Sequence, residues 1–273
     1  MSGRVRAVLV AALAATGLLM GPPPAARAAP EPTSVGYDVS HPQCGEDLPE
    51  RRAFAIVGVN GGLATRRNPC LVEQLEWAAG SSGAVSAQPA VQLYVNTANP
   101  GQVRHLVTTW PDDGQTPYGR CDGGNSRACS FRYGWIRAYV DVHGFFLPAA
   151  RRAGLDPDPA AYRWWLDVES ANTWQWGSAA ALARNRAALE GMTAYLEQTG
   201  AEVGLYSTGR QWARIVGDVP RDSRLHGLDS WLAGALSRAG AEDNCADRPL
   251  VDGGEVVLTQ YVEDDLDHDH SCG

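Results

Sequence analysis

The chain has 273 residues, six cysteines and a net charge of −8 at pH 7. The acidic balance argues against nucleic acid or another polyanion as a partner, because such polymers are bound by basic patches. All 23 basic residues are arginines, which excludes Schiff-base chemistry on a lysine and the phosphate-binding lysine of a P-loop.

The start of the chain has the layout of a secretory signal peptide. Two arginines precede an apolar stretch over residues 7–20, and a small-residue cleavage site ends at Ala28. The apolar stretch is shorter than the roughly 20 residues that span a bilayer. We therefore expect residues 1–28 to be removed, and residues 29–273 to form one secreted domain without membrane contact after cleavage.

The cysteines form an even set in a chain expected to be exported, which favours disulfides over metal ligands. Fifteen pairings are possible for six cysteines. The pairs we favour are Cys44–Cys70, Cys121–Cys129 and Cys245–Cys272. The middle pair would close a Gly-rich loop, and the other two would tie segments near either end of the domain.

Short apolar segments alternate with longer segments of helical character, which predicts β/α units around a largely parallel sheet. Strands are predicted over residues 35–40, 54–60, 91–97, 164–169, 203–207, 230–234 and 256–262, with 266–269 as a candidate eighth. Helices are predicted over residues 70–79, 132–153, 179–199 and 211–216. Because helical signals weaken between the last strands, we predict an α/β fold, a TIM-like (β/α) barrel with a reduced set of outer helices.

A long segment, roughly residues 99–130, is predicted to be irregular, because it is rich in Pro, Asp and Gly and carries the Cys121–Cys129 pair. Such a length is uncommon for a simple connection between elements. The segment is either a rim loop over a binding face or a surface loop that the disulfide stabilises, and the sequence leaves both open.

Two carboxylates two residues apart, Asp167 and Glu169, end a short apolar strand. Alternate side chains of a strand point the same way, so these two would project together, with Cα atoms about 6.6 Å apart. Close carboxylates repel when both are ionised, which gives an acid beside a base, the chemistry of glycoside hydrolysis. A solvated strand end is the alternative. The preceding Trp164-Trp165-Leu166 run and a second acidic motif around Asp38 favour a site.

Five short segments spread over the chain read as the strand motifs of one family. Residues 36–43 read G-Y-D-V-S-H-P-Q, residues 166–169 L-D-V-E, residues 204–207 G-L-Y-S, residues 231–233 W-L-A and residues 260–261 Q-Y. In this order they resemble glycoside hydrolase family 25, the secreted lysozymes or muramidases, whose strands read G-x-D-V-S-x-x-Q, L-D-V-E, G-x-Y-[ST], W-x-A and W-Q-Y.

The resemblance implies a barrel with fewer outer helices than usual, which cleaves the β-1,4 bond after N-acetylmuramic acid in peptidoglycan. It implies Glu169 as the general acid that protonates the leaving oxygen. Asp167 would be its partner, stabilising the cationic transition state or orienting the substrate acetamide. Asp38 matches the family's first-strand aspartate at the base of the cleft.

The family has a further aspartate on its final strand. Asp267 is the best match to it, and Asp264 or Asp265 could take its place. Whether a side chain or the substrate's own N-acetyl group attacks the sugar stays open. The spacing expected between Asp167 and Glu169 exceeds the roughly 5–5.5 Å of a nucleophile and acid across one bond, which favours substrate assistance.

Aromatic rings near strand ends are candidates for stacking on the flat faces of pyranose sugars. The candidates for substrate binding are Trp174, Trp176, Tyr206, Trp231 and Tyr261. Core packing is the alternative for each. Of Trp164 and Trp165, one ring should point outward under a helix, since neighbours on a strand face opposite ways.

The chain departs from the family at the expected sugar-binding rim. Residues 60–62 read N-G-G where the family has an acidic residue before glycine, residues 93–100 lack an aromatic-rich ending, and residues 231–235 lack the tyrosine of W-x-A-x-Y. Two functions therefore remain. The first is a secreted, lysozyme-like glycoside hydrolase, favoured by the intact acidic residues. The second is a degenerate carbohydrate-binding or cell-surface protein on the same barrel, favoured by the altered rim.

The tail over residues 267–270 reads D-H-D-H, and both residue types ligate zinc or nickel. A chain end beside Cys272 is more often solvated, so we expect no metal or other cofactor. The expected partner is a polysaccharide, peptidoglycan or a related glycan. No oligomer signal is visible, and we expect a monomer.

Overall fold

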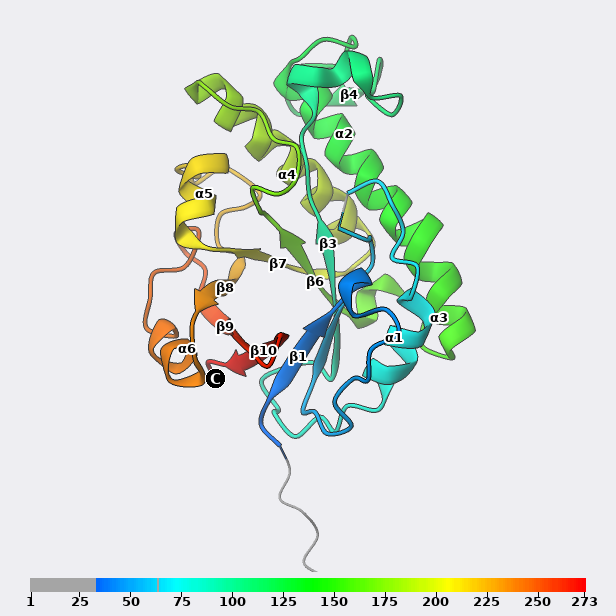
Figure 1. Cartoon of the computed structure of the whole chain (residues 1–273). Coiled ribbons are helices and arrows are strands. Elements are labelled where there is room, and N and C mark those ends of the chain that lie inside the picture. The colour runs from blue at the N-terminus through cyan, green and yellow to red at the C-terminus, as the bar shows by residue number, and fades with distance from the viewer. Residues whose placement is uncertain (1–32, 63) are drawn as a thin grey trace, which may run out of the picture. The chain divides into compact units, whose positions relative to one another are not determined.

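Eight strands close into a barrel in the order β1-β10-β9-β8-β7-β6-β3-β2 (Figure 1). The computed structural model describes residues 33–62 and 64–273, so the expected signal peptide lies outside the described residues. The barrel strands are β1 (Gly36–Val39), β2 (Ala55–Gly58), β3 (Val91–Asn96), β6 (Arg163–Asp167), β7 (Glu202–Ser207), β8 (Asp229–Ala235), β9 (Val256–Glu263) and β10 (Leu266–Ser271).

The barrel sheet is mixed, because β10 pairs antiparallel with both of its neighbours while the other barrel pairs are parallel. Figure 1 shows β10, in red, closing the barrel against the blue β1. Only Asp264 and Asp265 lie between β9 and β10, both with positive φ (51° and 60°). A parallel strand would need a crossover of a dozen or more residues, so a two-residue turn dictates the antiparallel pairing. The predicted TIM-like α/β barrel and its eighth strand are confirmed.

The helices are α1 (Leu71–Ala79), α2 (Arg127–Val140), α3 (Leu147–Ala153), α4 (Ala179–Gln198), α5 (Gly209–Ile215) and α6 (Arg238–Asn244). A π-helical segment, Asp141–Phe146, joins α2 to α3, and short 3₁₀ turns occupy His41–Gln43, Gly101–Leu106 and Pro159–Ala161. The connections β1–β2 and β9–β10 contain no α-helix, in keeping with the reduced helix set. The sequence prediction missed α6, whose seven residues show no apolar periodicity; Ser237 caps it by accepting a hydrogen bond from the Gly240 N–H.

The prediction of one irregular segment and then one helix over residues 132–153 was wrong in two respects. The helix begins at Arg127, because the Ser126 hydroxyl accepts a hydrogen bond from the Cys129 N–H at 3.1 Å and caps the first turn. It also widens into the π-helical segment just before Pro148. A proline inside a helix donates no backbone hydrogen bond and clashes with the carbonyl four residues earlier, and a wider turn relieves that clash.

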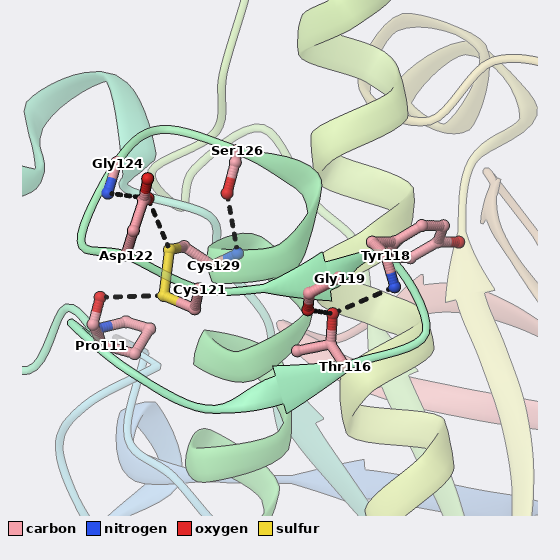
Figure 2. The surroundings of a disulfide bond; sticks show 9 residues. All are labelled: Pro111, Thr116, Tyr118, Gly119, Cys121, Asp122, Gly124, Ser126 and Cys129. Carbon is pink, nitrogen blue, oxygen red and sulfur yellow. Dashed lines mark hydrogen bonds between the residues drawn. A yellow bond between two sulfur atoms is a disulfide. The ribbon is translucent and has the colours of Figure 1, made fainter.

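The three predicted disulfides are present: Cys44–Cys70, Cys121–Cys129 and Cys245–Cys272. Figure 2 shows the middle one beside the hairpin of β4 (Gln115–Thr116) and β5 (Gly119–Arg120), at the start of α2. The segment over residues 99–130 is therefore not wholly irregular, since it holds a 3₁₀ turn, this hairpin and the first turn of α2. Among the described residues, no helix has the length and apolarity needed to cross a membrane.

Alternation along the strands divides the apolar side chains into two cores. The barrel interior holds Phe54, Ile56, Trp165, Tyr206, Trp231 and Leu258. The second core lies between the strands and the helices and includes Trp164, whose ring lies 5.2 Å from that of Phe146. The expectation that Trp164 and Trp165 face opposite ways is thus confirmed. Inside the barrel, the Trp165 indole N–H donates to Gln92 Oε1 at 2.8 Å.

Candidate active site

A pocket of about 280 Å³ opens where the parallel strands end. Its lining consists of Asp38, Tyr94, Asp167, Glu169, Tyr206, Trp231, Gln260 and Asp267. We call it the acid pocket. Four of these residues are carboxylic acids, three are aromatic, and none is basic. A pocket of this composition favours a cation or a cationic transition state and disfavours an anion.

The barrel's register explains why acidic residues far apart in sequence meet. Asp38 on β1 lies opposite Asp267 on β10, and Asp167 on β6 lies opposite Asn96 on β3. Glu169 follows two residues after Asp167 and lines the same pocket. All four predicted acidic residues therefore gather at one end of one barrel. The alternatives Asp264 and Asp265 lie exposed in the β9–β10 turn instead.

Gln260 on β9 connects two of the pocket's side chains. Its Nε2 donates to Asp38 Oδ2 at 2.8 Å, and its Oε1 accepts the Tyr206 hydroxyl at 2.8 Å. A buried amide with both ends satisfied holds its partners in one orientation. The hydrogen bond from Gln260 therefore fixes Oδ2 of Asp38.

Glu169 is half-buried and lies two residues beyond the end of β6. Its Oε1 accepts Gln211 Nε2 of α5 at 3.1 Å, and the Ser170 N–H donates to Gln211 Oε1 at 2.5 Å. The Trp174 indole N–H donates to the Glu169 carbonyl at 2.8 Å. These contacts fix the backbone and one carboxylate oxygen, while among the described residues no donor is assigned to Oε2.

Asp167 is 4% exposed, and its Oδ1 has no hydrogen-bond partner among the described residues. Burial raises the pKa of Asp167 well above its usual value, and the charges of Glu169 and Asp38 raise it further. A buried polar atom without a partner is costly unless a ligand completes it. Asp167 therefore presents an atom suited to a hydrogen bond from a bound molecule.

The remaining acidic residues repel one another in the same way. Burial raises the pKa of Asp38 well above its usual value, and the charge of Asp267 adds to this while the Gln260 hydrogen bond opposes it. Burial and then the charge of Glu169 raise the pKa of Asp267. Burial and mutual repulsion thus make the charged forms of these carboxyls costly, and a positive charge placed among them would relieve that cost.

Sequence reasoning considered Asp269 only as a metal ligand, whereas it is completely buried two residues after Asp267 on β10. Both of its carboxyl oxygens lack a hydrogen-bond partner among the described residues. Burial raises its pKa well above the usual value, followed by the charges of Asp38 and Asp267. The D-x-D spacing on one strand was the available signal, because it places both side chains on one face.

Tyr94, Gln260 and Gln211 were also missed. Tyr94 shares a strand face with Gln92, so alternation could have found it. For Gln260, the sequence prediction named its neighbour Tyr261, whose side chain points to the opposite face of the strand. Gln211 comes from a helix 42 residues after Glu169, and no local pattern indicates that contact.

The predicted aromatic residues divide into two groups. Tyr206 and Trp231 line the acid pocket, and the structure does not bring Trp174, Trp176 or Tyr261 into it. Trp174 is buried against the Glu169 carbonyl. Trp176 is half-buried, with the Arg214 guanidinium 5.0 Å from its ring centre. Tyr261 stacks at 5.0 Å on His268, on the opposite face of β9 from Gln260.

Within residues 33–62 and 64–273, no cluster of three or more His, Cys, Asp and Glu side chains has an arrangement that could hold a metal ion. In the D-H-D-H tail, Asp267 lines the acid pocket, Asp269 is buried and the His268 ring packs between Tyr37 and Tyr261.

No family model matches the chain, and no curated protein matches it. Two solved structures are similar: a muramidase from Trichobolus zukalii, with a TM-score of 0.45, and a muramidase from Acremonium alcalophilum, with a TM-score of 0.46. Each is 14% identical to this chain, and each alignment covers 88% of this chain and 94% of the other. At this identity and TM-score, the two structures do not identify the activity of this chain.

Proposed function

We propose that this chain is a secreted, lysozyme-like glycoside hydrolase that cleaves a β-1,4-linked polymer of N-acetylated amino sugars, peptidoglycan or a related glycan. One observation carries the proposal: Asp38, Asp167, Glu169 and Asp267 line one pocket together with Tyr94, Tyr206 and Trp231. Paired carboxyls beside aromatic rings are the parts that glycoside hydrolysis uses. The three disulfides support export.

Glu169 is the general acid in this proposal. It lies at the pocket mouth, half-buried, with Oε1 held by Gln211. Its other oxygen is available to carry a proton to the glycosidic oxygen as the bond to C1 breaks. The resulting carboxylate then takes a proton from the water that enters at C1, which restores the acid.

Asp167 is the residue that orients the reacting sugar. Its unpartnered Oδ1 would accept the N–H of the sugar's acetamide group, which aims the acetamide carbonyl oxygen at C1. That oxygen forms a bond to C1 as the leaving group departs, and this bond breaks when water, deprotonated by Glu169, attacks C1. This role leaves Asp167 outside bond formation, in keeping with the wide i, i+2 spacing expected from the sequence.

Asp38 and Asp267 stabilise the positive charge that develops on the sugar ring, because both face the same pocket from adjacent strands. No basic residue in the described lining opposes this effect. Gln260 keeps Asp38 in place through the hydrogen bond to its Oδ2. Preorganised charges in a partly enclosed site stabilise a transition state more than mobile water does.

The direct test is product analysis on isolated peptidoglycan. Incubation with the purified mature protein should release soluble fragments, and mass spectrometry should find N-acetylmuramic acid at every new reducing end. New ends on the other sugar would contradict muramidase specificity. Binding to the polymer without any new reducing end would favour a degenerate carbohydrate-binding protein on this barrel.

A further inference from the structure

A second pocket, of about 360 Å³, lies at the same end of the barrel as the acid pocket. Its lining comes from residues 64–65 after β2, residues 98, 100 and 106–109 after β3, residues 172–173 after β6, and Tyr133 of α2. None of its lining residues is charged. We call it the neutral pocket.

The neutral pocket adjoins the acidic residues through short hydrogen-bonded links. Asn172 lines it, and the Asn172 N–H donates to the Glu169 carbonyl at 3.3 Å. The Asn172 Nδ2 donates to Asn96 Oδ1 at 3.4 Å, and Asn96 lies opposite Asp167 in the β3–β6 register. Asn172 therefore links the lining of the neutral pocket directly to Glu169 of the acid pocket.

Contacts within the chain hold the walls of the neutral pocket in place. The Asn99 N–H donates to the Thr173 carbonyl at 2.7 Å, which ties the segment after β3 to the segment after β6. Trp110 stacks on Tyr133 at 5.5 Å and joins the same segment to α2. Figure 2 shows the Cys121–Cys129 disulfide and the Ser126 cap fixing the end of this segment. Preformed pockets of this size are typical of small-ligand sites.

The lining indicates an uncharged, amide-bearing ligand. Ala64, Ala98, Pro100, Leu106 and Val107 supply apolar surface, and the hydroxyls of Thr65, Thr108, Thr109 and Thr173 supply donors and acceptors. Leu106 is 74% exposed, which leaves an apolar side chain open to a ligand. Tyr133 is the one aromatic residue in the described lining and is 2% exposed, so it offers no open ring face for a sugar.

We propose that the neutral pocket binds the first, uncharged residue of a peptide branch attached by an amide to the amino sugar in the acid pocket, and so makes the protein selective for branched over bare glycan. This inference rests on the proposed function. Threonine hydroxyls and the Asn172 amide pair with the peptide groups of the branch, and the aliphatic side chains accept a small apolar residue such as alanine.

The kinetic test compares two substrates: peptidoglycan strands that carry their peptides, and the same strands from which an amidase has removed them. The wild type should show a kcat/KM at least about tenfold higher on the peptide-bearing strands. Leu106→Arg should bring the ratio close to one through a higher KM on peptide-bearing strands, with the rate on bare strands unchanged. Val103→Arg is the matched control, because Val103 lies on the same 3₁₀ turn, is 37% exposed and is outside the pocket lining.

Equal rates of the wild type on both substrates, or an equal loss on both in Leu106→Arg, would overturn the inference. A binding measurement separates this failure from failure of the proposed function. Glu169→Gln is titrated with a soluble N-acetylated amino sugar carrying an alanyl amide branch, and with the same sugar lacking it. We expect about tenfold tighter binding of the branched sugar, and equal binding contradicts the inference even if neither glycan is cleaved.

Discussion

Gln260 donates a hydrogen bond to Asp38, which lies 222 residues earlier in the chain, at 2.8 Å inside the acid pocket. The bond connects strands at opposite ends of the sequence and opposes the rise of the Asp38 pKa that burial causes. Gln260 therefore orients that carboxyl and favours its ionised form against the effect of burial.

Replacing Gln260 by leucine should lower kcat/KM by at least about tenfold, because Asp38 loses its donor. The pKa of Asp38 should also rise, which moves the acidic limb of the pH–activity profile to higher pH. Gln88→Leu is the control, since Gln88 is a buried amide that donates to Val257 O and Ser271 Oγ at the other end of the barrel. A control that shifts the profile equally would contradict this role for Gln260.

Asp141 should make the protein less stable as the pH rises. Burial raises its pKa to about 7, and Arg137, whose Nη2 lies 4.0 Å from Oδ1, offsets this only in part. The folded chain therefore keeps a proton between about pH 4 and 7 that the unfolded chain releases, so the free energy of unfolding falls through that window.

Asp141→Asn should remove this dependence. Its free energy of unfolding should therefore rise relative to that of the wild type by on the order of 2 kcal/mol as the pH goes from 4.5 to 7.5. Urea unfolding at the two pH values measures the gain, and Asp243→Asn on the exposed surface of α6 is the control. A constant difference between Asp141→Asn and wild type at both pH values would show that Asp141 is not held protonated.

Two glycines allow α2 and α4 to cross closely. A Cβ atom at Gly134 would lie 1.8 Å from the Ala188 carbonyl oxygen, and one at Gly191 would lie 2.0 Å from the Phe131 carbonyl oxygen. Gly134→Ala and Gly191→Ala should each lower the free energy of unfolding by about 3 kcal/mol, because the backbones of the two helices must move apart. Gly144→Ala is the control, since its nearest atom lies at 3.5 Å. Thermal unfolding that ranks Gly144→Ala with the other two would contradict this packing.

The disulfides should differ in what they contribute to stability. Cys245–Cys272 closes a separation of 27 residues and Cys121–Cys129 one of 8. Restriction of the unfolded chain predicts losses of about 3.5 and about 2.5 kcal/mol for the two double serine variants. Chemical denaturation gives both values, and a larger loss for the shorter loop would show that the native state, and not the unfolded chain, determines them.

Local patterns predicted most of the barrel and the acidic residues of its pocket. Strand alternation predicted that Asp167 and Glu169 project together and that Trp164 and Trp165 face opposite ways, and residues 266–269 were predicted as a candidate eighth strand. Contacts made only by closure of the barrel could not be read in this way. Gln211 meets Glu169 from a later helix, and no local pattern marks that pairing.

The start of α2 was missed for a different reason. Its first turn lies in a segment rich in turn-forming residues, where the Ser126 cap and the Cys121–Cys129 disulfide override weak local propensity. The neutral pocket was equally hidden, because its lining comes from four separate parts of the chain. Sequence alone left the role of residues 99–130 open. In the fold, part of that segment forms a wall of the neutral pocket, beside the acidic residues.

The most direct test of the account is the initial rate of reducing-end release from peptidoglycan by Glu169→Gln. Glutamine keeps the shape of the side chain and can still bond to Gln211, but it has no acidic proton to give to the leaving oxygen. We expect the rate to fall about 10²- to 10⁴-fold, with binding to the polymer within about twofold of wild type. A variant that releases reducing ends at the wild-type rate would contradict Glu169 as the acid, and with it the proposed mechanism.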